Sequence, residues 1–433
     1  MRFLDQFRTG WRNLRRQKLR TTLTIFAIVI GAVSVTVMLS LVTSAKSFLV
    51  TSAEKTGMDK RVIVTGSKGL DYRESTWAWA DGTGTRIDQS VLDKVTKVGN
   101  VNSATLYTSL NVLASWKIGN YSGDMKNTHA EAYTPNGTIR HMMIAGAELS
   151  DATNGKGVLI TSGIAKDAGF KGREAELVGK EVTFSYRDDY GPDARKPDFT
   201  ATIVGVAMGS DGDSFSFDLD WAVKMDRFEF EQNGPNGAKE KRVESQIERS
   251  GYSSIWVDVK DKNSVDAVLN DVKSLGYGAA AGKEEIDNQA TVFTIIGLVL
   301  GGIGGIALLV AAIGVINTMV MATLERTREI GIMRAIGATK KTIRRLFTVE
   351  AGVLGFMGGV FGVALAFAFA LGLNQILNKQ LADSGIADRD IVSVSPAVAL
   401  AVIAITTVIG MIAGRLPARR AANMDPVEAL RYE

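Results

Sequence analysis

The sequence predicts an α-helical membrane protein with four transmembrane helices and a large α+β extracytoplasmic domain inserted between helices 1 and 2. Three observations lead to this fold class. Four long runs contain no charged residue, and the polar segment 46–287 separates the first run from the second. Lysine and arginine also gather beside the runs, which is typical of the cytoplasmic side of a membrane protein.

The four uncharged runs are 21–45, 288–324, 351–378 and 391–414. Each is longer than the roughly 20 residues that an α-helix needs to cross the bilayer core. The first run follows a basic segment and also fits a signal peptide, but its apolar core exceeds the usual roughly 7–15 residues, so we expect a retained anchor. The uncharged interiors argue against an ion-coupled carrier, which needs ionisable groups within the membrane.

Basic residues orient the chain. Seven Lys/Arg precede the first run, seven lie between the second and third, and four follow the last. Residues 46–287 carry a net charge of −6 and the remainder carries +10. The positive-inside rule therefore predicts a multi-pass protein of the cell (inner) membrane with cytoplasmic N- and C-termini. Positive charge beside apolar runs favours contact with membrane lipid and not with nucleic acid.

Helix length decides the predicted segment boundaries. The second run would form a helix of about 55 Å against about 30 Å of hydrocarbon, so we expect the first two spans to continue outside as a paired stalk. Two ordinary spans with flexible connections are the alternative. The expected segments are 1–20 (a cytoplasmic amphipathic helix), 21–45 (first span, with a stalk extension to about 56, before Gly57), 57–282 (an α+β domain of two lobes), 283–321 (stalk and second span), 322–348 (a cytoplasmic loop), 349–376 and 391–414 (third and fourth spans) and 415–433 (a cytoplasmic tail).

Small residues at four-residue spacing predict how the spans pack. Gly297, Gly301 and Gly305 form one such ladder in the second run, and Gly358 and Gly362 begin another in the third. Such ladders let helix backbones approach closely in lipid, where apolar attraction alone does not drive association. The "GIGGIA" segment also fits a dinucleotide fingerprint, but no strand precedes it, so we reject that interpretation.

The external segment alternates strand and helix patterns. Strands are predicted at 61–65 and 255–259. A helix is predicted after Asp88, which suits an N-cap, and another at about 264–275 with an apolar face of valine and leucine. These patterns indicate α+β lobes.

The sequence contains no motif that indicates a metal site or a cofactor site. There is no cysteine, and His129 and His141 are the two histidines, so we expect no metal site and no cofactor held by this chain. An acidic run contains four aspartates, but an EF-hand would need glycine at Ser216 and glutamate at Ala222, so a solvated acidic turn is the better interpretation. The aspartates are Asp211, Asp213, Asp218 and Asp220. Trp77, Trp79 and Trp116 suit core or interface packing better than a substrate contact.

The loop "ERTREIGIMRAIGATKKTIRRL", Glu325–Leu346, combines charge with isoleucine. As a helix it places Glu329, Met333 and Ile336 on one line, flanked by Ile330 and Ile332. Two positions suit its ends: Gly337 for the C-terminus and Thr339 as the cap of the next helix. Lys340 and Lys341 oppose the dipole of that next helix, so we expect them to contact lipid headgroups. An amphipathic helix of this kind either docks a partner or lies at the membrane surface as an anchor.

Two motifs carry a resemblance to a known family. "ERTREIGIMRAIGAT" and the C-terminal "PARRAANMDPVEALRYE" resemble the hallmarks of the FtsX/MacB-like ABC-transporter permease family. "GVLITSGIAKDAGF", "LVGKEVTFSY" and "FTATIVGVAMG" are similar to the external domain of its macrolide-exporter branch, and "WRNLRRQKLRTTLTIFAIVIGAVSV" also fits the family. The resemblance spans the whole chain.

The resemblance implies a non-catalytic permease subunit that works with a cytoplasmic ABC ATPase, on which ATP and Mg²⁺ bind. No Gly-Lys pair in the chain fits a Walker motif, and 20 residues before the first run leave no room for a fused ATPase, so we expect a separate ATPase subunit. The resemblance also implies a second permease copy, which would form a homodimer or a heterodimer with this chain. It allows an extracytoplasmic adaptor as a further partner. The loop 322–348 becomes the ATPase-coupling helix, with docking residues Glu325, Arg326, Arg328, Glu329, Ile330, Gly331, Met333, Arg334, Ile336 and Gly337.

The function expected from this resemblance is export. ATPase-driven motion would pass from the coupling helix to the external domain and extrude amphiphilic substrates such as antibiotics or peptides. Three alternatives are also compatible with the sequence. They are extraction of lipoproteins, FtsX-type transmembrane signalling to cell-wall hydrolases, and a membrane-anchored binding protein without an ATPase.

Overall fold

The structure is a computed structural model, and it describes residues 18–76, 84–126, 128–150, 155–187, 196–209, 213–233, 239–381, 392–424 and 429. The chain divides into two compact units, with boundaries between Lys46 and Ser47, between Thr291 and Val292, between Ile376 and Leu377 and between Arg389 and Asp390. We call them the helical unit, which holds the apolar helices, and the α+β unit, which holds the strands. The predicted helix at 1–20 lies almost entirely outside the described residues, as do Trp77, Trp79 and Asp211.

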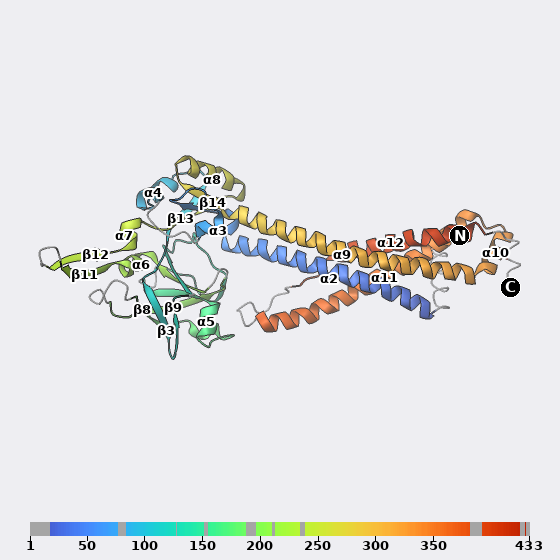
Figure 1. The fold of residues 1–433 in the computed structure, drawn as a ribbon, viewed down its shortest axis with the longest axis horizontal. Coiled ribbons are helices and arrows are strands. Elements are labelled where there is room, and N and C mark those ends of the chain that lie inside the picture. Colours follow the sequence, from blue (N-terminus) through green and yellow to red (C-terminus); the bar gives the residue numbers. More distant parts are fainter. Residues whose placement is uncertain are drawn as a thin grey trace. The chain divides into compact units, whose positions relative to one another are not determined.

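In the part of the chain that the structure describes, four helices are long and apolar enough to cross a membrane, as the sequence predicts. A short helix, α10, connects the second and third of them (Figure 1). The helices are α2 (Lys18–Thr56), α9 (Gly282–Glu325), α10 (Thr327–Ala335), α11 (Lys340–Leu381) and α12 (Pro396–Ala422). α2 ends directly before Gly57, whose φ of 72° lies in the left-handed region that favours glycine. Whether parts of α2 and α9 extend beyond the membrane stays a prediction.

Glycines let α11 approach α2 closely. A Cβ atom at Gly358 would lie 2.4 Å from Ile28 Cγ2, and one at Gly362 would lie 2.4 Å from Ala32 Cβ. Both distances are too short for real carbon atoms, so no residue larger than glycine fits there without moving a helix. The structure thus places this ladder at a helix–helix contact of the kind that small residues permit.

The ladder on α9 follows a different line from the predicted one. A Cβ at Gly297 would lie 3.0 Å from Val42 Cγ1 and one at Gly301 would lie 3.8 Å from Leu39 Cδ2. A Cβ at Gly305 would meet no atom of another described element within 4 Å. Gly304 makes the close approach instead, at 2.5 Å from Val35 Cγ2. The reason is geometric: a step of four residues drifts by about 40° around a helix, whereas a step of seven nearly returns to the same face.

A further contact, between α11 and α12, was missed by the spacing argument. Cβ atoms at Gly355 and Gly359 would lie 2.3 Å from the backbone oxygen and the hydroxyl of Thr406, and one at Gly410 would lie 2.6 Å from Ala351 O. Near the other end of α11, buried Asn374 donates to Val392 O at 2.9 Å and accepts from Val392 N at 2.8 Å. These bonds satisfy a buried amide that would otherwise be costly.

The α+β unit contains fourteen strands among the described residues, and twelve of them belong to one sheet. The strands are β1 (Arg61–Thr65), β2 (Val101–Ser109), β3 (Leu113–Ile118), β4 (Tyr121–Asp124), β5 (Thr128–Tyr133), β6 (Met143–Gly146), β7 (Gly157–Thr161), β8 (Glu181–Tyr186), β9 (Phe199–Ala207), β10 (Asp213–Asp218), β11 (Phe228–Asn233), β12 (Lys239–Glu244), β13 (Ser254–Val259) and β14 (Gly278–Ala281). The short helices are α3 (Tyr72–Thr76), α4 (Gln89–Val95), α5 (Ser162–Asp167), α6 (Leu219–Asp226), α7 (Gln246–Ser250) and α8 (Val265–Ser274), with 3₁₀ turns η1 (Met58–Lys60), η3 (Glu174–Leu177) and η5 (Lys262–Ser264).

The sheet runs in the order β14-β1-β13-β2-β5-β10-β7-β9-β8-β3-β4, with β6 beside β9, and β11 and β12 form a separate hairpin. One hydrogen-bonded path therefore joins all the main strands, and the predicted two lobes do not appear as separate sheets. The larger apolar cluster includes Val62, Phe184, Phe215 and the buried face of α8, and a smaller one contains Ile63, Tyr107 and Trp256. Because Val62 and Ile63 are adjacent in β1, the two clusters lie on opposite faces of the sheet.

Several local predictions for this unit are confirmed. β1 has the predicted bounds, and Asp88 caps α4 by accepting from the backbone of Ser90 and Val91. The apolar face of α8 is buried as expected. In the acidic run, Asp218 caps α6, and Thr161 Oγ1 lies 3.3 Å from Asp213 Oδ1, so both serve local structure. Trp116 is buried in the core.

Replacing Gly362 by alanine tests the close packing of α2 and α11. Gly362→Ala should lower the free energy of unfolding in detergent by about 1–3 kcal/mol, the usual cost of overpacking, and so lower the thermal midpoint. Gly372→Ala on the same helix is the matched control, since a Cβ atom at Gly372 would meet no atom of the described residues within 4 Å beyond the backbone of its own helix and its two chain neighbours. It should leave the midpoint unchanged or raise it, because alanine is the better helix former. Equal midpoints for the two variants would contradict this packing.

Replacing Asp88 tests the cap of α4. Asp88→Ala should reduce the local stability of α4 by about 1 kcal/mol, while Asp88→Ser should retain most of it. The hydrogen bond from the Ser90 hydroxyl, aided by backbone N–H groups, lowers the pKa of Asp88. A lowered pKa means that the ionised cap stabilises the fold above its unfolded pKa and loses this effect as pH falls through the folded pKa, below about pH 4. Hydrogen exchange of the α4 amides, with and without the cap, measures both effects.

Candidate functional site: the α10 connection

The C-terminal end of α10 is a turn with a defined hydrogen-bond pattern. Gly337 has a φ of 102°, which a non-glycine residue rarely adopts. Its N–H donates to Arg334 O at 3.1 Å, and Ala338 N–H donates to Met333 O at 2.9 Å. This pair of bonds is the Schellman motif that ends many helices. Gly337 therefore ends the helix where the sequence predicts.

The neighbouring helix ends are also fixed by side chains. Thr339 Oγ1 accepts from the N–H of Thr342 at 3.2 Å and so caps α11, as predicted. At the junction of α9 and α10, the Thr327 hydroxyl donates to Leu324 O at 2.6 Å. α10 is thus a short helix whose start and end are both held by specific bonds.

The inner face of α10 packs into the helical unit. Ile330 is fully buried and belongs to an apolar cluster with Phe347 of α11 and Ala418 of α12, and Met333 packs against the same cluster. Gly331 is also buried. The expected single docking face is therefore corrected, because Ile330 and Gly331 face the chain's own core. Residues 330 and 332 are separated by about 200° around a helix, so they cannot share one face.

A buried ion pair joins the start of α10 to α11. Arg326 Nη1 lies 3.2 Å from Glu350 Oε1, and the two side chains are 13% and 4% exposed. Arg326 was expected to pair with a partner protein, but the structure uses it inside the chain. Sequence reasoning missed Glu350 as its partner. The available signal was the position of Glu350, a carboxylate directly before the uncharged run 351–378.

The outer face of α10 is formed by Arg328, Glu329, Ile332 and Ile336, all of which are exposed. Ile332 is 47% exposed and Ile336 is 80% exposed. Their spacing of four residues places them one turn apart on the same side of the helix. Arg328 and Glu329 lie one turn before Ile332, so charge borders an apolar pair.

Basic side chains lie near α10 on the adjoining helices. Lys340, Lys341, Arg344 and Arg345 are exposed on the first turns of α11. Arg415, Arg419 and Arg420 are exposed on the last turns of α12, which contacts α10. This end of the helical unit is therefore strongly positive. Among the described residues no group of three or more His, Cys, Asp or Glu side chains is placed to hold a metal ion.

Four apolar helices, a charged connection at one end and an α+β domain between the first two helices define a polytopic membrane protein with a large extramembrane domain. Comparison with known proteins gives the family. Residues 21–275 match the MacB-like periplasmic core domain, and residues 301–426 match the FtsX-like permease C-terminal domain. The chain belongs to the FtsX/MacB-like family of ABC transporter permeases.

Individual relatives agree with this assignment. The chain is 28% identical over 445 residues to the pyoverdine export ATP-binding/permease protein PvdT of Pseudomonas savastanoi pv. phaseolicola, covering 99% of this chain and 60% of that protein. It is 25% identical over 453 residues to the macrolide export ATP-binding/permease protein MacB of Rhodopirellula baltica, covering 97% of this chain and 61% of that protein. The ABC transporter permease YtrF of Bacillus subtilis is 32% identical over 186 residues, 42% of this chain and 43% of YtrF.

The chain thus spans about 60% of the length of the ATP-binding/permease relatives. Among solved structures, the periplasmic region of MacB from Actinobacillus actinomycetemcomitans matches with a TM-score of 0.33 and 14% identity, covering 55% of this chain and 98% of that one.

Removing one partner of the Arg326–Glu350 pair tests its role in holding α10. Glu350→Leu should destabilise the helical unit by about 3–5 kcal/mol, because it leaves a buried guanidinium without its carboxylate. Arg326→Met combined with Glu350→Leu should recover much of the loss, since two apolar side chains replace two charges. Thermal unfolding in detergent measures all three chains. If the double variant is as unstable as the sum of the single variants, the two groups are not coupled.

Proposed function

We propose that this chain is the permease subunit of an ABC exporter. In this proposal the outer face of α10 docks a separate cytoplasmic ATPase subunit, and ATP and Mg²⁺ bind to that subunit, with no catalytic role for this chain. The observation that carries the proposal is the exposed pair Ile332 and Ile336, bordered by charge, on a helix that is otherwise held firmly by its own protein.

The two faces of α10 have different contacts: one packs inside the permease and the other is exposed. The buried face and the Arg326–Glu350 pair fix the helix in the permease, so a force on its outer face is passed to α9 and α11. Apolar side chains in the centre of a contact supply affinity, and charges at the rim set register and orientation. Arg328 and Glu329 would have the rim role, and Ile332 and Ile336 the central one.

The distribution of charge supports the orientation that we propose for the chain. Exposed lysines and arginines at the α10 end favour the cytoplasmic side and anionic lipid headgroups of the inner membrane. The α+β unit then lies outside. α2 ends at Thr56, shortly before β1 begins at Arg61, and α9 begins at Gly282, directly after β14 ends at Ala281. Motion of these two helices would therefore reach the sheet through very short connections.

Export of an amphiphilic compound is the transport reaction that we propose. The names of two relatives refer to export of pyoverdine and of macrolides. A second permease copy would complete the transporter, and an extracytoplasmic adaptor is a further partner in this proposal. The exposed apolar side of α9 would face lipid or the second copy.

Charging the outer face of α10 tests the docking proposal. Ile336→Asp should abolish co-purification of an ABC ATPase from the native host and stop export, while the thermal midpoint of the permease stays unchanged. The midpoint should not move because Ile336 is 80% exposed and its side chain supports little of the fold.

Leu275→Asp is the matched control, since it charges an exposed leucine of the α+β unit, 47% exposed, and should leave ATPase capture intact. Absence of any ABC ATPase on the parent chain, or undiminished capture by Ile336→Asp, would refute docking through this face.

A further inference from the structure

The connection between α2 and the sheet is a compact junction. α2 ends at Thr56, Gly57 turns the chain with a φ of 72°, and η1 leads into β1 at Arg61. A Cβ at Gly57 would lie 3.2 Å from Arg140 Nη2, so the guanidinium of Arg140 covers the turn. Few residues and close packing leave this connection little freedom.

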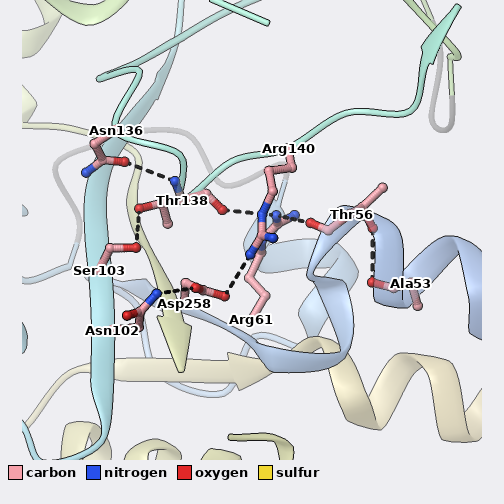
Figure 2. A network of polar contacts seen from close by, with 9 residues as sticks. All are labelled: Ala53, Thr56, Arg61, Asn102, Ser103, Asn136, Thr138, Arg140 and Asp258. Atoms are coloured by element: carbon pink, nitrogen blue, oxygen red, sulfur yellow. Dashed lines mark hydrogen bonds and ion pairs between the residues drawn. The ribbon is translucent and has the colours of Figure 1, made fainter. Parts of the chain in front are cut away.

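Arg61 is at the centre of the junction, and its side chain is almost fully buried. Its Nη2 group donates to Thr56 O, the last residue of α2, at 2.7 Å and to Thr138 O at 3.4 Å. The guanidinium also lies over the ring of Trp256 in β13, with 4.7 Å between Cζ and the ring centroid. One planar side chain thus joins the end of a helix, a loop and a neighbouring strand. Figure 2 shows its bonds to Thr56 and Thr138.

Side-chain bonds connect the loop that contains Thr138 and Arg140 to strands β2 and β13 of the sheet. Arg140 Nη2 lies 3.5 Å from Asp258 Oδ1, and Asn102 Nδ2 donates to Asp258 Oδ2 at 2.8 Å. The Thr138 hydroxyl donates to Ser103 Oγ at 2.9 Å. Figure 2 shows the side chains of Arg61 and Arg140 converging on the end of α2. The carbonyl that Arg61 holds at residue 138 is therefore part of a connected network and not of a free loop.

The start of α9 is packed against the same place. β14, which leads directly into α9, pairs with β1, so the strands that adjoin the two long helices are neighbours in the sheet. A Cβ at Gly282 would lie 2.2 Å from Met58 O, which shows that the first residue of α9 touches η1. Asp59 of η1 also lies 3.9 Å from Lys262 Nζ of η5.

The chemistry of arginine explains why this residue suits the position. The last carbonyls of a helix lack intrahelical partners and carry partial negative charge, so a cation there is favourable. A guanidinium can donate to two carbonyls while its flat face rests on an indole ring. A lysine ammonium keeps the charge and one bond, but it has no planar face and cannot reproduce this geometry.

We propose that Arg61 is a positioning residue that makes the end of α2, β1 and β13 one rigid body, so that movement of α2 is transmitted to the sheet and not absorbed by the connection. This inference rests on the proposed function, because it assigns to Arg61 the handover of ATPase-driven motion. Without Arg61, α2 would still be covalently connected to β1, but the C-terminal end of the helix would move independently of that strand.

Hydrogen exchange on the purified full chain tests the rigid junction without any partner. Arg61→Met should raise the exchange of amides at 53–61 by at least about tenfold, the lower limit expected when a hydrogen bond to a charged group is lost, and leave β2 and β9 unchanged. Arg61→Lys should give an intermediate value. Arg173→Met removes an exposed arginine elsewhere in the α+β unit and should change none of these amides. Unchanged exchange at 53–61, or an equal rise throughout the sheet, would overturn the proposal.

The complex with its ATPase supplies a readout that a merely structural role would not move. In the parent complex, a non-hydrolysable ATP analogue should alter the exchange of β1 and β14. Arg61→Met should still capture the ATPase but lose this nucleotide response, and Arg61→Lys should restore part of it. A full response in Arg61→Met would overturn the proposal. If the parent chain captures no ATPase, the proposed function fails, and the exchange of 53–61 alone then decides whether Arg61 joins the helix to the sheet.

Discussion

The buried Arg326–Glu350 ion pair is the constraint on which the connection between the second and third apolar helices depends. Each charge stabilises the other in the buried site, because burying either one alone would carry a large desolvation cost. Their pairing holds the α9–α10 junction against α11, and Ile330 then packs into the apolar cluster between them. With these groups committed inward, Ile332 and Ile336 face outward. The same interaction thus both anchors α10 and decides which of its side chains a partner meets.

In the rest of the helical unit, close packing of helix backbones holds the helices together. α11 contacts α2 at Gly358 and Gly362 and contacts α12 at Gly355 and Gly359. Contacts of this kind rely on backbones that nearly touch, because lipid chains are as apolar as the side chains they replace. α11 is therefore held on two sides by small residues and, at Glu350, by an ion pair. A force on α10 would meet a packed element and not a loose helix.

The α+β unit continues this design at the end of α2. In the chain, α2 leads into β1 and β14 leads into α9. These two strands are hydrogen-bonded neighbours in the sheet. Arg61 satisfies a helix-end carbonyl and rests on Trp256 in the next strand. In both units, then, a buried arginine fixes the end of a helix. One is balanced by a carboxylate, and the other by carbonyls and an aromatic ring.

The sequence by itself determined the four apolar helices, the inserted α+β domain and the family, because run length, charge position and specific motifs are properties of the linear chain. It also placed local features such as the Asp88 cap and the turn at Gly337, which depend on a few neighbouring residues. Only the tertiary structure decided that Gly304 and not Gly305 meets α2, that Ile330 faces inward, and that Arg326 pairs with Glu350 and Arg61 with Thr56 and Trp256. Each of these depends on the rotation of a helix or on a contact with another element, and residue spacing alone does not specify either.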